Sequence, residues 1–245
     1  MNRERQLAKA FVELSDTYAP EFDPLHLFNR LVHACRGLLE VDAAAVMIAD
    51  ARGSLKTMAA TDDGAAFVEL LQMQSGRGPC MDCFRTGEAR DVPDIRTERA
   101  RWPKLAVAMS EAGYRSLHTV AVRLHERPLG AVTLLNADVG ALPDDDMHLA
   151  QALADSSALA LMHWSTEPTR GDDVITRVQS AIAAKAALDI AKGIIAENAG
   201  VSIGDAGRLL TAYAARHRVS LATTIRNLVN RTMPPDAVVG TRAPD

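Results

Sequence analysis

The segment LDIAKGII, residues 188–195, lies within the most regular stretch of the chain and decides how its C-terminal part is interpreted. Apolar residues recur every three or four positions around it: Ile175, Val178, Ile182, Leu188, Ala191 and Ile195. This spacing places them on one face of an α-helix. The sequence therefore predicts a helix from about residue 174 to a break at residues 198–200.

Two further helices are predicted after this break. Ser202 can cap the first, with Asp205 three residues later as in a capping box, and Ser220 can cap the second. Each has one apolar side, formed by Ala206, Leu209, Leu210 and Tyr213 in the first and by Leu221, Ile225 and Leu228 in the second. Residues 174–233 are thus predicted to form a three-helix unit.

The predicted three-helix unit is basic, although the chain has a net charge of -4. Residues 172–233 contain eight Lys or Arg against five Asp or Glu, and residues 1–171 contain 18 against 24. From residue 206 to residue 233 there are five arginines and no acidic residue. The acidic N-terminal part and the basic C-terminal part indicate that only the C-terminal part faces a polyanion such as nucleic acid.

The N-terminal part has the pattern of a mixed α and β unit. Helices are predicted over residues 2–18, 24–39, 64–74 and 104–112, in a short segment after residue 83, and from residue 143 onward. Ala43 to Ala49 is a short apolar run typical of a buried strand, and Leu55 to Ala60 can pair with it. Residues 117–124 and 129–136 form the clearest hairpin, and residues 89–92 a short extended piece. The predicted class is α+β with an antiparallel sheet.

Composition limits the classes of protein further. The 245 residues are 48% hydrophobic, which is enough for real cores. The polar N-terminus does not resemble a signal peptide, and no run of about 18 apolar residues predicts a membrane span. Three cysteines are too few for a disulfide framework. We therefore expect a cytoplasmic protein, with a linker at residues 165–173 and a disordered tail at residues 234–245.

Cys80 and Cys83 form a C-x-x-C motif in a turn-rich segment, residues 75–83. Such a motif suggests redox or metal chemistry in a cytosolic protein, but the chain has no second ligand pair for zinc. Structural or pocket-lining thiols are the main alternative. We keep Cys80, Asp82 and Cys83 as a candidate ligand or redox site and predict no metal site and no catalytic residue. Gly76-Arg77-Gly78 lacks the Lys-Ser/Thr of a phosphate-binding loop.

Two family resemblances organise these observations. LDIAKGII, followed by Ser202, Asp205-Ala206, Leu210, Ala214 and Leu221, resembles the ANTAR domain, an RNA-binding antitermination module. Residues 22–164 look like a GAF domain, through the segments DAAAVMIAD, GRGPCMDCFRTGEA, GYRSLHTVAVRL and LGAVTLLN. The order GAF then ANTAR occurs in actinobacterial regulators. Asp50 begins a hairpin turn, so a phosphoreceiver domain, which often accompanies ANTAR, is excluded by the order of the elements.

The resemblance implies a dimeric, non-enzymatic regulator that binds RNA hairpins in nascent transcripts and prevents a terminator from forming. A GAF sensor spanning residues 1–164 would bind a small ligand or supply a dimer interface. In the ANTAR unit, residues 174–233, we expect Ala191, Lys192 and Gly193 to approach RNA closely and Arg208, Arg216 and Arg218 to contact phosphates. Lys192 beside a glycine would contact phosphate, unless it is only a solvated lysine beside a packing glycine. Tyr213 lies on the apolar side, so we expect it to pack in the core.

The sequence departs from the ANTAR pattern at three positions. Gly207 stands where an aromatic residue often occurs, Thr211 where an arginine does, and Ile225 where a small residue is expected. The alternative to RNA binding is a ligand or redox sensor whose C-terminal helices serve only dimerisation or partner binding. An enzyme that uses Cys80 or Cys83 would need a base near the thiol, and none is placed there by the sequence.

Overall fold

The computed structural model describes residues 3–16, 24–163 and 173–239 and divides into two compact units, Met1–Gln179 and Ser180–Asp245. The first unit contains α1 (Arg3–Ser15), α2 (Pro24–Leu38), β1 (Ala43–Ala49), β2 (Leu55–Ala60), α3 (Asp63–Ser75), α4 (Pro79–Thr86), β3 (Arg90–Val92), α5 (Pro103–Glu111), β4 (Ser116–Leu124), β5 (Arg127–Asn136) and α6 (Asp144–His163). The linker predicted at residues 165–173 lies, except for Asp173, outside the described residues.

The five strands form one sheet in the order β2-β1-β5-β4-β3, and every neighbouring pair is antiparallel. The predicted α+β class and the antiparallel hairpin are confirmed. The hairpin turn is shorter than the sequence suggested, because β4 and β5 pair as far as Leu124 and Arg127. Gly130 in β5 is required by the sheet, since a Cβ at this position would lie 2.0 Å from the Met47 carbonyl oxygen of β1.

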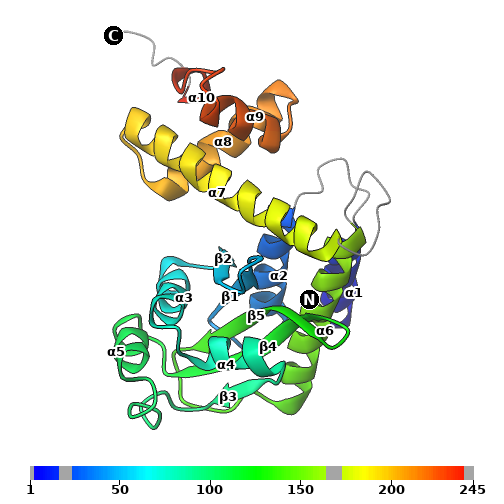
Figure 1. Cartoon of the computed structure of the whole chain (residues 1–245), viewed down its shortest axis with the longest axis vertical. Helices are drawn as coiled ribbons and strands as arrows, with labels where there is room; N and C mark the ends of the chain where they lie inside the picture. The colour runs from blue at the N-terminus through cyan, green and yellow to red at the C-terminus, as the bar shows by residue number, and fades with distance from the viewer. Residues whose placement is uncertain (1–2, 17–23, 164–172, 240–245) are drawn as a thin grey trace. The chain divides into compact units, whose positions relative to one another are not determined.

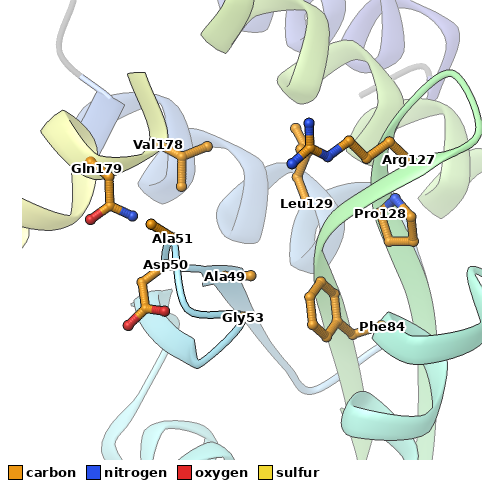
Figure 2. Close-up of a pocket in the computed structure, with 10 residues that line it drawn as sticks. All are labelled: Ala49, Asp50, Ala51, Gly53, Phe84, Arg127, Pro128, Leu129, Val178 and Gln179. Carbon is orange, nitrogen blue, oxygen red and sulfur yellow. The ribbon is translucent and has the colours of Figure 1, made fainter. Parts of the chain in front are cut away.

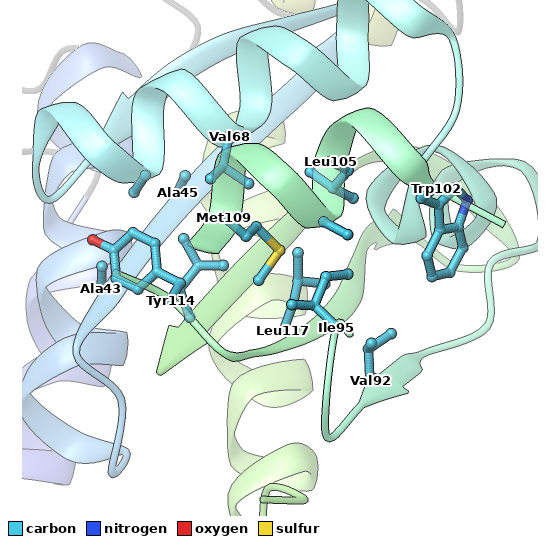
Figure 3. Close-up of a cluster of buried hydrophobic side chains, with 13 residues drawn as sticks. Ala43, Ala45, Val68, Val92, Ile95, Trp102, Leu105, Met109, Tyr114 and Leu117 are labelled. Atoms are coloured by element: carbon cyan, nitrogen blue, oxygen red, sulfur yellow. The ribbon is translucent and has the colours of Figure 1, made fainter. Parts of the chain in front are cut away.

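Helices cover both faces of the sheet. Helices α2 and α6 pack on one face, with α1 against them, and α3 and α4 pack on the other, with α5 beside α3 (Figure 1). Alternate residues of each strand therefore face different helices. The first buried cluster on the α3 side joins strand residues such as Ala45 and Leu117 to Val68 of α3 and Met109 of α5, with Tyr114 at one end (Figure 3).

Local hydrogen bonds explain where α3 begins. The Asp62 carboxylate accepts the Ala65 backbone N–H at 2.8 Å and so caps the helix. It also accepts a hydrogen bond from the Tyr114 hydroxyl at 2.9 Å, which ties the start of α3 to the segment between α5 and β4. Asp50 accepts the backbone N–H groups of Arg52 and Ser54, each at 2.9 Å, which confirms its position in the β1–β2 turn.

The second unit begins within α7 (Asp173–Ala199), at Ser180. It also contains α8 (Ile203–His217), α9 (Leu221–Val229) and α10 (Asp236–Val239). The predicted caps are confirmed: Ser202 accepts the Asp205 N–H at 3.1 Å and Ser220 accepts the Thr223 N–H at 3.0 Å. Residues of the predicted apolar faces are buried in the core of the unit: Leu188, Ala191, Ile195, Ala206, Leu210, Ile225 and Leu228.

The disordered tail predicted at residues 234–245 is wrong for residues 236–239. These residues form α10, and Val238 is buried. Helix α10 packs against α8, so Val238 adds to the core of the second unit. Three prolines and few apolar residues are typical of a disordered segment. Composition does not reveal that a single short turn in this segment can pack against α8. Residues 240–245 lie outside the described part.

Candidate functional sites

The AKG tripeptide lies on α7 with its three residues in different environments. Ala191 is buried in the core of the second unit, whereas Lys192 and Gly193 are half-buried. Burial lowers the pKa of Lys192, and the nearby positive charge of Lys185 lowers it further. Among the described residues, no carboxylate lies within ion-pair distance of Lys192. Asp189, whose charge acts to raise the pKa of Lys192, pairs with Lys185. The Lys192 ammonium is thus available to an external anion.

The close approach predicted at Gly193 remains a prediction, and the structure shows only the surroundings of this glycine. No described atom outside its own helix lies within 4 Å of a Cβ placed on Gly193. It is therefore not a packing glycine within this unit, and its surface is open to a ligand. Ala191 cannot touch RNA, because its side chain has no exposed surface. Ala191 therefore packs in the core of the second unit and is not an RNA contact.

Arg208 and Arg216 lie on α8 and Arg218 is its C-cap, and the three arginines do not form one cluster. Arg208 is in the second turn, with a side chain that is 76% exposed and an ion pair to Asp205. Arg216 and Arg218 are exposed at the C-terminal end, roughly 12 Å further along the helix axis at 1.5 Å per residue. Neither forms an ion pair among the described residues. The two arginines without partners also complement the negative end of the helix dipole.

The sequence missed an aromatic pair beside these arginines. The rings of Tyr213 and His217 lie one helical turn apart, with their centroids 4.2 Å from each other. Tyr213 is half-buried rather than fully in the core. The i, i+4 spacing of two aromatic rings was the signal that could have revealed the pair. It places a flat, partly exposed surface on the helix that carries Arg216.

In the first unit, Cys80 and Cys83 lie on α4 and not in an irregular turn. Both thiols are buried against the sheet, in a second cluster with Met47, Ala121 and Ala131. Asp82 lies on the outer side of α4, where Arg101 forms an ion pair with it at 2.7 Å. The three predicted site residues therefore do not share one site. Asp82 links α4 to the segment before α5 through its ion pair with Arg101, whereas the two thiols face the core.

Burial makes the two thiols poor nucleophiles. It raises the pKa of Cys83 to about 11 from 9.0, and the pKa of Cys80 rises well above its ordinary value for the same reason. The neighbouring Glu69 raises the pKa of Cys80 further. Thiolate is the reactive form, so neither thiol is activated as redox chemistry would need.

We predict that Cys80 and Cys83 resist alkylation in the folded chain. A rise of about two pKa units lowers the thiolate fraction about 100-fold, before any effect of limited access. Iodoacetamide labelling at pH 8, followed by mass spectrometry of the peptides, measures the rates. Labelling of either cysteine at the rate found in the urea-unfolded chain would contradict this assignment and favour a redox role.

Next to the thiols lies a buried polar cluster that the sequence did not reveal. It consists of Glu69 and Gln72 of α3, the N-terminal turn of α4, and Thr133 of β5. Gln72 donates to Glu69 Oε1 at 3.2 Å, and its own Oε1 accepts the Cys80 N–H at 3.0 Å. Glu69 Oε2 and the Thr133 hydroxyl are buried without a hydrogen-bond partner among the described residues.

Burial raises the pKa of Glu69 to about 7 from 4.5. Thr133 and Cys80 act in the opposite direction but do not cancel the loss of water around the carboxyl group. Glu69 is therefore about half protonated near neutral pH and largely protonated below it. A buried acid with this pKa makes the interior of the first unit sensitive to proton concentration.

A pocket of about 310 Å³ opens elsewhere in the first unit. Asp50 and Ala51 of the β1–β2 turn lie on one side, and Phe84 of α4 and Pro128 of β5 lie on another (Figure 2). Its volume suits a small molecule. None of the predicted residues Cys80, Asp82 and Cys83 lines it. Among the described residues, no group of three or more His, Cys, Asp or Glu side chains is arranged to hold a metal ion.

Comparison with known proteins identifies the first unit. The family model of the GAF domain matches residues 23–161. The GAF domain of a phosphoenolpyruvate-protein phosphotransferase from Coxiella burnetii is similar in structure, with a TM-score of 0.51 and 17% identity over 66% of this chain and 94% of that one. The corresponding Acinetobacter domain has a TM-score of 0.50 and 12% identity over 75% and 97%. No curated protein sequence matches the chain.

The chain belongs to the GAF domain family, whose members typically sense small ligands in signalling proteins. The predicted GAF resemblance is thereby confirmed, and the solved structures agree with it in fold. The family match ends at residue 161 and leaves the second unit unassigned. No helix in the described residues is long and apolar enough to cross a membrane.

Proposed function

We propose that the chain is a cytoplasmic, non-enzymatic transcription antitermination regulator, in which the GAF domain senses a small ligand and controls RNA binding by the second unit. The second unit would be an ANTAR domain and would bind hairpins in nascent transcripts, with the chain acting as a homodimer. The sequence resemblance around LDIAKGII supports this proposal, together with the order of the three helices α7, α8 and α9, the last two of which begin at serine caps.

One observation carries the RNA-binding part. Lys192, Arg216 and Arg218 are cationic side chains without ion-pair partners among the described residues, in a unit that is basic within an acidic chain. Unpaired cations on a helical surface can neutralise phosphates and release counterions. Tyr213 and His217 add rings on which an unpaired loop base can stack, as RNA recognition often requires.

Changing Lys192 to Ala tests this proposal. We expect the affinity of the full chain for a hairpin RNA to fall about 5- to 10-fold at 0.1 M salt, and the slope of log affinity against log salt to fall by about one, because one phosphate contact is lost. Fluorescence anisotropy at two or more salt concentrations measures both. Lys56→Ala, an exposed lysine on β2, is the matched control and should change neither.

The alternative function assigns the C-terminal helices only to dimerisation or partner binding. It predicts no RNA affinity for the wild-type chain in any ligand or redox state. An unchanged affinity and salt slope in Lys192→Ala would remove Lys192 from the RNA interface. The redox form of this alternative is not favoured by the two buried, protonated thiols.

A further inference from the structure

Gly207 of α8 lies directly under the side chain of Lys192 from α7. A Cβ at position 207 would lie 3.0 Å from Lys192 Cε and 3.7 Å from its Nζ. The lysine stem therefore occupies the space in which a side chain at position 207 would lie. By contrast, Gly204, one turn earlier on α8, has room for a Cβ at ordinary contact distances.

The backbone around Gly207 is also held by a specific contact. The Thr211 hydroxyl donates to the Gly207 carbonyl oxygen at 3.1 Å. Gly207 and Thr211 are thus bonded to one another, and the Cδ and Cε methylenes of Lys192 lie beside Gly207. Long cationic side chains commonly bury their stems in this way while the charged end stays at the surface.

The position of the Lys192 ammonium follows from this packing. Lys185 and Asp189, on the same side of α7, pair with each other, and Asp205 of α8 pairs with Arg208. Asp189, the acid whose charge acts on the pKa of Lys192, is thus already bound to Lys185. The stem is fixed by packing on Gly207 while the ammonium has no carboxylate partner among the described residues. Such a group loses little conformational entropy when it meets a phosphate.

We propose that Gly207 is a positioning residue for RNA binding, which fixes the Lys192 ammonium by leaving room for its stem across α8. This role rests on the proposed RNA-binding function. In this chain the stem of Lys192 takes the volume that a side chain on α8 would fill. A large side chain at position 207 would displace the stem into solvent and leave the ammonium free to move.

Gly207→Leu is the direct test in the full chain, with Gly204→Leu as the control on the same helix. We expect the pKa of Lys192, measured by NMR of its side chain, to rise towards the ordinary lysine value in Gly207→Leu, because the stem leaves its buried position. We also expect hairpin RNA affinity to fall several-fold, approaching that of Lys192→Ala. Gly204→Leu should change neither quantity. Gly207→Ala, which Lys192 can accommodate by a small shift, should lie between the wild type and Gly207→Leu.

A double substitution separates positioning from a general effect on folding. Lys192→Met keeps an apolar stem and removes the charge, so adding Gly207→Leu to it should cause no further loss of RNA affinity. Additive losses, or an unchanged Lys192 pKa in Gly207→Leu, would overturn the positioning role. If Lys192→Met weakens binding and Gly207→Leu does not, the proposed function stands and the role of Gly207 is wrong. If the wild-type chain binds no RNA, the proposed function fails, and this role for Gly207 with it.

Discussion

Replacing Glu69 with Gln is expected to stabilise the GAF domain by about 3 kcal/mol above pH 8 and to have no effect near pH 4. The pKa of Glu69 is raised to about 7 from 4.5 by burial, and about 2.5 units correspond to roughly 3 kcal/mol at 1.36 kcal/mol per unit. Below pH 4.5 the carboxyl group is protonated in both the folded and the unfolded chain. Between pH 4.5 and 7 only the unfolded chain loses the proton, so the wild type loses stability as the pH rises.

Gln keeps the interactions that Glu69 makes when it is protonated. Its carbonyl oxygen can accept from Gln72, and its amide can donate to the Thr133 hydroxyl, which faces the Glu69 carboxyl group. Urea unfolding followed by tryptophan fluorescence, at several pH values between 4 and 9, measures the difference. Glu111→Gln, an exposed glutamate on α5, is the control. Parallel stability curves for the wild type and Glu69→Gln would show that Glu69 does not titrate as its burial requires.

Removing three unpaired cations of the second unit is expected to lower hairpin RNA affinity on the order of 100-fold at 0.1 M salt. The variant combines Lys192→Ala, Arg216→Ala and Arg218→Ala. Each phosphate contact contributes about 0.7 to 0.9 to the slope of log affinity against log salt, so the slope should fall by about 2 to 3. Arg208→Ala should have a smaller effect, because Asp205 already neutralises Arg208.

The matched control removes the same charge from the GAF domain. It combines Lys56→Ala, Arg77→Ala and Arg99→Ala, which are exposed in the first unit. If net charge alone attracts RNA, both triple variants lose affinity equally, and the assignment to the second unit fails. A selective loss in the Lys192, Arg216 and Arg218 variant places the contacts on α7 and α8. Fluorescence anisotropy with the same RNA and a range of salt concentrations measures both variants.

Local sequence signals were sufficient for most of the backbone. The capping residues Ser202 and Ser220 and the apolar spacing around Ala191 predicted the helices of the second unit. The apolar run at Ala43–Ala49 predicted the buried strand β1, since period and length both favour a strand there. These features depend on residues close together in the chain. That is why they could be inferred without tertiary contacts.

The features that were missed depend on packing between distant segments. Glu69 lies on a correctly predicted helix, but it is buried because residues of α4 and β5 pack against its carboxyl group. The contact between Lys192 and Gly207 joins residues from two helices. The sequence indicated Gly193 as the site of close approach to RNA because it follows Lys192 directly in the chain. Gly207 is distant from Lys192 in the sequence but contacts its side chain in the folded unit. Helical periodicity alone does not determine which glycine on a neighbouring helix meets a given side chain.

Ultraviolet crosslinking of the full chain to a hairpin RNA, with the crosslinked peptides mapped by mass spectrometry, tests the central claim most directly. We expect crosslinks within residues 180–233, concentrated on the peptides that contain Lys192, Tyr213 and Arg216, and we expect them to be lost at high salt. An unstructured RNA of the same length should crosslink less. Crosslinks confined to the GAF domain, residues 23–161, or no crosslink at low salt, would contradict RNA binding by the second unit.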